Sequence, residues 1–191
     1  MIESLLLSAV RISTFSESTP LTNASGFFFE RSGRLYLVSS RHVFIDEASE
    51  HFPDRIEIEL HIDLNNLANS TGYSIPLYRN RMSIWRQATD SSGEVDVAVI
   101  EIDRSAFPAD AAYTAFTQDH IFDSPAIEID SSMLVVGFPL GFHDTLHHLP
   151  WRLLGVHSAR LDLGTRDMEL DEALGLNCTW FADILKTLTE A

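Results

Sequence analysis

The sequence predicts an all-β protein, and three observations carry that prediction. About six stretches within the first hundred residues have strand patterns. No long helical pattern separates them. Of the 191 residues, 45% are hydrophobic and 12 are Phe, which is ample material for a packed core. Short strands without intervening helices favour a small closed antiparallel barrel, which we assign to residues 1–103.

The first element predicted is a β-hairpin. Three phenylalanines at 27–29 lead into the turn-forming residues 30–34, and residues 35–38 are again apolar. Further along, residues 56–63 alternate between apolar and polar side chains. This alternation is the period of a strand with one buried face and one solvated face.

The remaining strands of this lobe are predicted from weaker or different patterns. Two short strands are expected near residues 73–77 and 82–87, between polar turns. Residues 95–102 are almost continuously apolar, which predicts a strand buried on both faces. Residues 104–127 show little periodicity and are interpreted as a connector between two lobes.

The second lobe, residues 128–191, is predicted to be a partial β-barrel followed by a helix. A strand group begins at 132–141, and another strand covers 151–159. Residues 177–188 have apolar side chains at helical spacing behind Asn177, a favourable N-cap, so a C-terminal helix is expected. A six-stranded barrel needs about 60 residues before any helix is added, so this lobe is too short for a complete one.

The charge of the chain excludes some classes of partner. Lys and Arg number 13 against 28 Asp and Glu, which gives a formal net charge of -15. That charge repels nucleic acid and anionic membranes, so neither is expected as a partner. A basic peptide or protein fits better, and the alternative is that the acidic surface only keeps the protein soluble.

A single cysteine, Cys178, rules out an internal disulfide and favours a reducing compartment. The N-terminal segment 1–11 has an apolar patch, but it is too short for a membrane span and lacks the basic start of a signal peptide. These features predict a cytoplasmic protein.

His42 and Asp96 are the candidate catalytic residues. His42 follows an apolar strand that turns polar at residues 39–41, a place where a base is held rigidly beside the surface. Asp96 is surrounded by apolar residues, and a buried carboxylate needs a partner, for which an imidazole N–H is well suited. Two alternatives stay open: His42 caps a turn, or Asp96 accepts backbone N–H groups.

Five segments together resemble trypsin-like serine peptidases of the chymotrypsin fold, of the disulfide-free intracellular kind. The segments, in the order of that family, are Ser25-Gly26-Phe27-Phe28-Phe29, Leu37-Val38-Ser39-Ser40-Arg41-His42-Val43, Asp96-Val97-Ala98-Val99-Ile100, Gly137-Phe138-Pro139-Leu140-Gly141 and Leu154-Gly155-Val156-His157-Ser158-Ala159.

The resemblance implies two antiparallel six-stranded Greek-key barrels, the second incomplete here, with a C-terminal helix. It implies that His42 is the general base and that Asp96 orients it. The strand containing Gly155, Val156, His157, Ser158 and Ala159 is similar to the one that lines the specificity pocket and pairs with the substrate backbone. No cofactor is implied, and the partner is a peptide or protein substrate, for which the net charge favours a basic one.

The chain departs from the family at the nucleophile. The family carries a Gly-x-Ser-Gly loop before the pocket strand, which supplies the serine and the oxyanion hole. Here residues 138–157 contain no serine, and Thr145 is their only hydroxyl. We therefore expect a trypsin-like serine endopeptidase whose serine lies in a segment absent between Pro150 and Trp151. The alternative is a catalytically inactive relative that binds a basic partner.

Two further features have a chemical and a bland interpretation. On a helix, His143 and His147 would lie one turn apart and could bind zinc, which would make the chain a metal-dependent hydrolase. Gly141 and Pro150 around them favour a surface loop instead, so no metal is assigned. Cys178 is expected on the C-terminal helix as a packed thiol.

Overall fold

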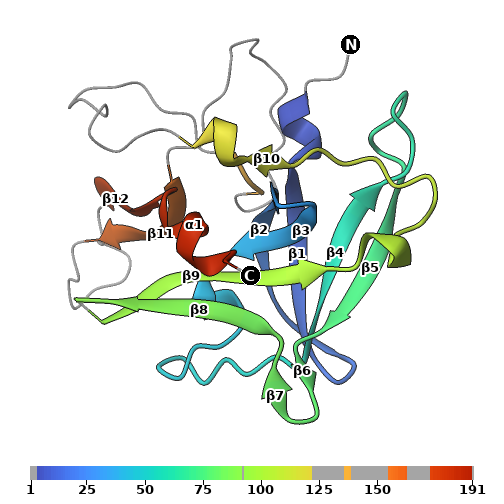
Figure 1. Ribbon diagram of the computed structural model, residues 1–191. Helices are drawn as coiled ribbons and strands as arrows, with labels where there is room; N and C mark the ends of the chain where they lie inside the picture. Colours follow the sequence, from blue (N-terminus) through green and yellow to red (C-terminus); the bar gives the residue numbers. More distant parts are fainter. Residues whose placement is uncertain (1–3, 92, 122–135, 139–154, 163–172, 191) are drawn as a thin grey trace.

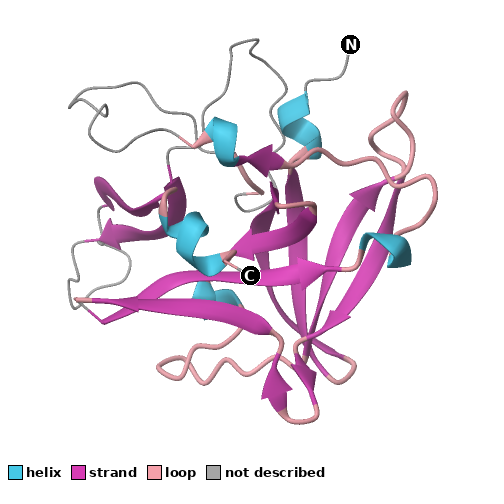
Figure 2. Ribbon diagram, in the orientation of Figure 1, coloured by secondary structure: helices cyan, strands magenta, loops and turns pink. Residues whose placement is uncertain are grey.

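The computed structural model describes residues 4–91, 93–121, 136–138, 155–162 and 173–190, and Figure 1 shows their arrangement. Strands predominate in it, as Figure 2 shows. The helical segments of the described residues are short: the α-helix α1 (Ile184–Leu188) and the 3-10 helices η1 (Ser4–Leu7), η2 (Arg41–Val43), η3 (Arg104–Ala106) and η4 (Gln118–His120). The prediction of a mostly β protein with a C-terminal helix is confirmed at this level.

The main sheet is antiparallel along its whole path, in the order β5-β4-β1-β2-β3-β9-β8. Its strands are β1 (Ala9–Ser16), β2 (Thr19–Arg31), β3 (Arg34–Ser39), β4 (Arg55–His61), β5 (Ser70–Pro76), β8 (Trp85–Asp90) and β9 (Gly93–Ile102). The two-residue strand β10 (Phe116–Thr117) pairs with β2 in parallel. Two separate ribbons are formed by β6 (Tyr78–Arg79) with β7 (Met82–Ser83), and by β11 (Gly155–Asp162) with β12 (Ala173–Phe181).

The hairpin predicted around residues 30–34 joins β2 to β3. Phe28 pairs with Leu37 across it. Its loop is made by Ser32 and Gly33, both with positive φ, of 52° and 77°. Positive φ at both loop positions matches the right-handed twist of the strands, and glycine adopts it without a steric penalty.

One face of every strand in the main sheet contributes to a single inner core. β4 shows why: Ile56, Ile58 and Leu60 are buried and the residues between them are not. This is the alternation predicted from the sequence. The buried members of the inner core are Val10, Ile12, Phe28, Leu35, Leu37, Val43, Phe44, Ile56, Ile58, Leu60, Ile75, Leu77, Trp85, Ala98, Ile100 and Ile102.

β9 is buried on both faces, as its continuous apolar run predicted. Ile100 faces the inner core, while Val97 and Val99 face an outer cluster. That outer cluster also contains Leu185 and Leu188 of α1. Figure 1 shows α1 lying beside β8 and β9, with the β11–β12 ribbon next to it.

Two predicted elements are corrected. Residues 177–181 are not helical: they belong to β12, where Trp180 pairs with Val156. Cross-strand pairing with β11 therefore overrides the helical spacing, and the helix begins behind Asp183 rather than Asn177. The strand expected at 82–87 is interrupted after Ser83, because the β6–β7 hairpin uses the first two residues and β8 starts at Trp85.

Other predicted segments lie partly outside the described residues. The connector, described as far as residue 121, contains η3, β10 and η4. Of the strand group at 132–141 only 136–138 is described, and of the strand at 151–159 only 155–159. The backbone N–H of Phe138 donates to Ser25 Oγ on β2 at 2.7 Å. A Cβ on Gly137 would lie 2.8 Å from the same oxygen, so a larger residue there would have to displace the Ser25 hydroxyl. No helix in the described ranges is long and apolar enough to cross a membrane.

Candidate functional site

His42 lies on a tight turn fixed by the inner core. β3 ends at Ser39, and the chain turns through η2, where the backbone N–H of Phe44 donates to the carbonyl of Arg41 at 2.8 Å. Val43 and Phe44, directly after His42, are both buried in the inner core. The turn is therefore anchored by side chains in the inner core, while the imidazole of His42 stays at the surface.

Asp96 lies at the end of the inward-facing row of β9. Val95 and Val97 point into the outer cluster, so Asp96 shares a face with Ala98 and Ile100. It is the first polar position in that row beyond the inner core, and its side chain is 27% exposed. At this position on β9, the carboxylate of Asp96 lies next to the turn that carries His42.

Two hydrogen bonds join His42 to Asp96. The Nδ1 atom of His42 lies 2.8 Å from Asp96 Oδ2, and the backbone N–H of His42 donates to Asp96 Oδ1 at 2.9 Å. The structure thus brings together the two residues paired from the sequence. The alternative of a backbone N–H partner is also realised, because the second carboxylate oxygen accepts one. In the neutral imidazole this arrangement places the proton on Nδ1 and leaves Nε2 as the basic nitrogen.

The site is electrostatically tuned toward a more basic imidazole. The hydrogen bond that His42 Nδ1 donates to Asp96 raises the pKa of His42 above the ordinary value of 6.5, and burial opposes this rise. The negative charges of Asp96 and then Asp46 add to it. Asp46 is itself held by the hydroxyl of Ser49 and the N–H of Ala48, and its own pKa is lowered, first by the Ser49 hydrogen bond.

This arrangement is chemically that of a base and its orienting acid. The His42 side chain is 48% exposed, so a reacting group can approach its ring from solvent. Proton transfer from a hydroxyl to Nε2 would create an imidazolium that the carboxylate stabilises. The nucleophile itself is not placed, because the segment where the resemblance expects it contains no serine.

The predicted pocket strand is described mainly by its backbone. Gly155, Val156, His157, Ser158 and Ala159 lie on β11, paired with β12. Val156 is buried in the outer cluster. The side chains of His157, Ser158 and Ala159 lie outside the described part of the chain, as do His143, Thr145 and His147 entirely.

Cys178 is on a strand, not on a helix as predicted, because β12 pairs it with Ala159 of β11. In the parts of the chain that the structure describes, no group of three or more His, Cys, Asp or Glu side chains is arranged to hold a metal ion.

Sequence reasoning missed Arg41. Its guanidinium contacts Glu47, Glu94 and Gln87, which belong to three different segments. Asp46 was missed as well. The only signal in the sequence was that Arg41 is a charged residue beside the candidate base. Its partners Glu47, Gln87 and Glu94 lie 6 to 53 positions further along, and the sequence spacing does not reveal these pairings.

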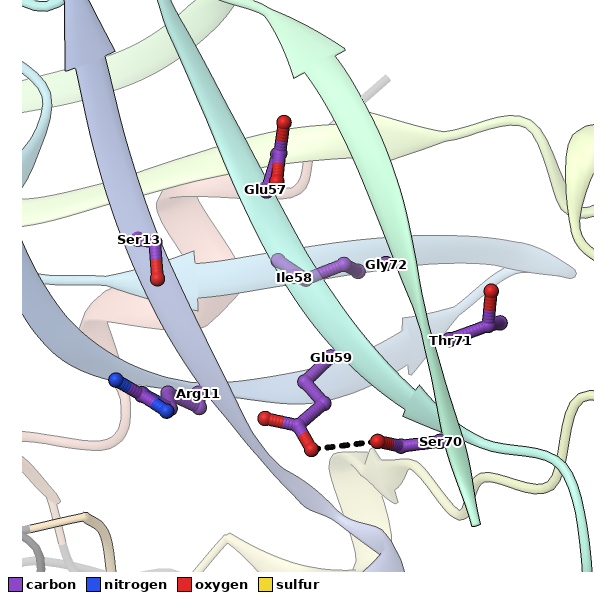
Figure 3. Close-up of a pocket in the computed structure, with 8 residues that line it drawn as sticks. All are labelled: Arg11, Ser13, Glu57, Ile58, Glu59, Ser70, Thr71 and Gly72. Carbon is purple, nitrogen blue, oxygen red and sulfur yellow. Dashed lines mark hydrogen bonds between the residues drawn. The ribbon is translucent and has the colours of Figure 1, made fainter. Parts of the chain in front are cut away.

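A shallow polar pocket of about 240 Å³ lies elsewhere, on the outer face of β1, β4 and β5. Figure 3 shows the residues that line it: Arg11, Ser13, Glu57, Ile58, Glu59, Ser70, Thr71 and Gly72. Glu59 accepts a hydrogen bond from Ser70 at 2.6 Å, so part of its polar lining is already satisfied internally. Neither His42 nor Asp96 lines it, and we assign it no part in the candidate site.

Comparison with known proteins adds no family. No protein-family model, no curated protein and no solved structure matches this chain.

Proposed function

We propose that this chain is a trypsin-like serine endopeptidase in which His42 is the general base and Asp96 orients it. The observation that carries the proposal is the double hydrogen bond between these residues, with Nε2 left for a nucleophile. A buried or half-buried carboxylate on Nδ1 is the arrangement that fixes the tautomer a general base needs. The order of the sequence motifs is the second support.

We propose that the main sheet is a six-stranded barrel of the chymotrypsin type. In this interpretation β5 and β8 are two parts of one strand, interrupted by the β6–β7 hairpin. The strand order supports it, because β5 and β8 stand at the two ends of the path. The single inner core shared by all these strands supports it as well. The β11–β12 ribbon and α1 would then belong to the partial second barrel.

The nucleophilic serine is proposed to lie in a segment absent between Pro150 and Trp151. The short second lobe and the lack of serine in 138–157 support this proposal. Without that segment proteolysis should be negligible, since loss of a triad nucleophile costs on the order of a million-fold in rate.

The test starts with the intact mass of the protein made from its native gene. The 191 residues weigh 21.4 kDa, so a peptidase requires a heavier product. That product should form a serine adduct with a fluorophosphonate probe, and His42→Ala should abolish the labelling while Arg34→Ala should not. A heavier protein that takes no label would refute the peptidase proposal.

A mass of 21.4 kDa would instead favour the second candidate, a catalytically inactive binding module. The missing serine and the net charge of -15 support this candidate, with a basic protein or peptide as partner. Titration with a polylysine peptide should then show salt-dependent binding, and an equally charged polyglutamate peptide should not bind.

A further inference from the structure

Arg41 directly precedes the candidate base, and its side chain is only 13% exposed. Its Nη2 lies 3.1 Å from Glu47 Oε1 and 3.2 Å from Glu94 Oε2. Its Nε donates to Gln87 Oε1 at 3.1 Å. One guanidinium therefore connects the His42 turn to the loop after it, to β9 and to β8.

Arg41 and His42 make similar contacts with the same strand. Arg41 contacts Glu94 while His42 contacts Asp96, and these acids are two positions apart on β9. Residues two apart on a strand share a face, so the two neighbours on the turn contact two successive positions on one face of β9. The turn is therefore joined to β9 at two points.

The far end of this network is connected to the inner core. Gln87 also accepts a hydrogen bond from Trp85 Nε1 at 3.3 Å, and Trp85 belongs to the inner core. The planar guanidinium has five donors in fixed directions, which suits it to hold several acceptors at once.

We propose that Arg41 is a positioning residue for the His42–Asp96 pair. The contribution of Arg41 to catalysis rests on the proposed function, whereas its effect on the pair itself does not. The competing view is that Arg41 makes ordinary surface ion pairs, which typically contribute little.

The two views predict opposite changes in the pKa of His42 when Arg41 is replaced. Removing a nearby positive charge by itself raises the pKa of a histidine. If Arg41 instead holds the turn in place, its removal loosens the hydrogen bond to Asp96, which is the largest cause of the raised pKa. The pKa of His42 then falls. The charged groups around the two residues are Asp96 and Asp46 near His42, and Glu47 and Glu94 near Arg41.

The experiment is an NMR titration of the ¹⁵N-labelled protein, with the His42 ring signal assigned by its loss in His42→Ala. Arg41→Ala should lower the pKa of His42 by about half a pH unit or more. Gln87→Ala changes no charge and should lower it in the same direction. Arg34→Ala is the control, because it also removes an ion pair to β9, between Arg34 of β3 and Glu101 at 3.4 Å, but away from the His42 turn, and it should leave the pKa of His42 unchanged.

An unchanged or higher His42 pKa in Arg41→Ala would overturn the proposal. If that variant does not fold, the same result in Gln87→Ala overturns it. Because this readout needs no substrate or probe, it stands whether or not fluorophosphonate labels the protein.

Discussion

Two regions of this molecule, the main sheet and the C-terminal ribbon with its helix, differ in what stabilises them. Residues 9–102 form a sheet in which every strand of the path pairs with a neighbour, around an inner core. Residues 155–162 and 173–190, the described part of the second region, contribute a two-stranded ribbon and one short helix. An isolated two-stranded ribbon is marginal in water, and a five-residue helix is too short to be stable alone. The described part of the second region therefore depends on the first for its apolar burial.

The polar contacts between the regions show the same dependence. Arg31 of β2 donates to the carbonyl of Lys186 and to Thr189, and Arg86 of β8 donates to the carbonyl of Glu190. These acceptors lie at or just beyond the C-terminal end of α1, where cationic side chains are favourable. The main sheet thus supplies both the apolar face and the cations that hold the helix.

The largest effect is expected from Phe28→Ala, which breaks the first region. Phe28 is fully buried in the inner core on β2, and its truncation should lower the free energy of unfolding by about 3–5 kcal/mol. Urea denaturation measures the loss. Phe52→Ala is the matched control, because that ring is 52% exposed and should change stability by less than about 0.5 kcal/mol. Equal losses in both variants would contradict the inner core described here.

Leu185→Ala should destabilise the second region while leaving the first region folded. Leu185 is fully buried in the outer cluster, so the lost contacts amount to about 2–5 kcal/mol, but they join α1 to the sheet rather than strands to each other. Hydrogen exchange should show faster exchange in α1, β11 and β12, with the β2–β3 amides still protected. Uniform loss of protection in β2 and β3 would mean that the regions unfold as one unit.

This difference between regions also explains how well each was predicted. The β2–β3 hairpin and the strand at 56–63 have local signals, a turn at Ser32-Gly33 and a two-residue alternation, so sequence patterns sufficed. Residues 177–181 have no such local determinant. Their strand conformation comes from pairing with β11, a tertiary effect that spacing does not reveal.

The candidate site follows the same rule. His42 and Asp96 were found because a polar residue beside an apolar run is visible in the sequence. Arg41 and Asp46 were not found, because their roles depend on which segments the fold brings near them. The missing nucleophile is a feature of the sequence alone.

Asp96→Asn tests the site within the first region, with a smaller effect on stability because the pair is partly exposed. The amide should lower the raised pKa of His42. A histidine whose pKa is raised in the folded state stabilises the folded protein. This stabilisation is complete at pH values below the ordinary pKa of about 6.5, and it is lost as the pH rises through the raised pKa. The stability difference between wild type and variant should therefore be larger at about pH 5.5 than at about pH 9.

The matched control for this variant is Asp103→Asn. Asp103 caps η3 through Ser105 and its pKa is lowered by those hydrogen bonds, so its effect should be the same at both pH values. Denaturation curves at the two pH values provide the measurement. A pH-independent difference for Asp96→Asn would show that the backbone hydrogen bond, not the imidazole, accounts for its contribution.

The smallest expected effect lies at the boundary between the regions. Among the side chains of the described residues, two buried polar atoms have no hydrogen-bond partner, the Tyr36 hydroxyl and the Trp180 Nε1. Tyr36 is a member of the outer cluster and Trp180 packs against it, whereas the inner core contains neither. Both of these side-chain atoms thus lie where the second region joins the first.

Tyr36→Phe should therefore leave the free energy of unfolding unchanged or raise it by up to about 1 kcal/mol, because an unpartnered buried hydroxyl carries a desolvation penalty. Thr14→Val is the contrasting variant: Thr14 Oγ1 is buried and accepts from the N–H of Thr22 at 2.9 Å, so its loss should cost about 1–3 kcal/mol. Thermal denaturation of both variants measures the contrast. A clear loss in Tyr36→Phe would show that the hydroxyl is paired in the folded protein, and the boundary would then be as well satisfied as the inner core.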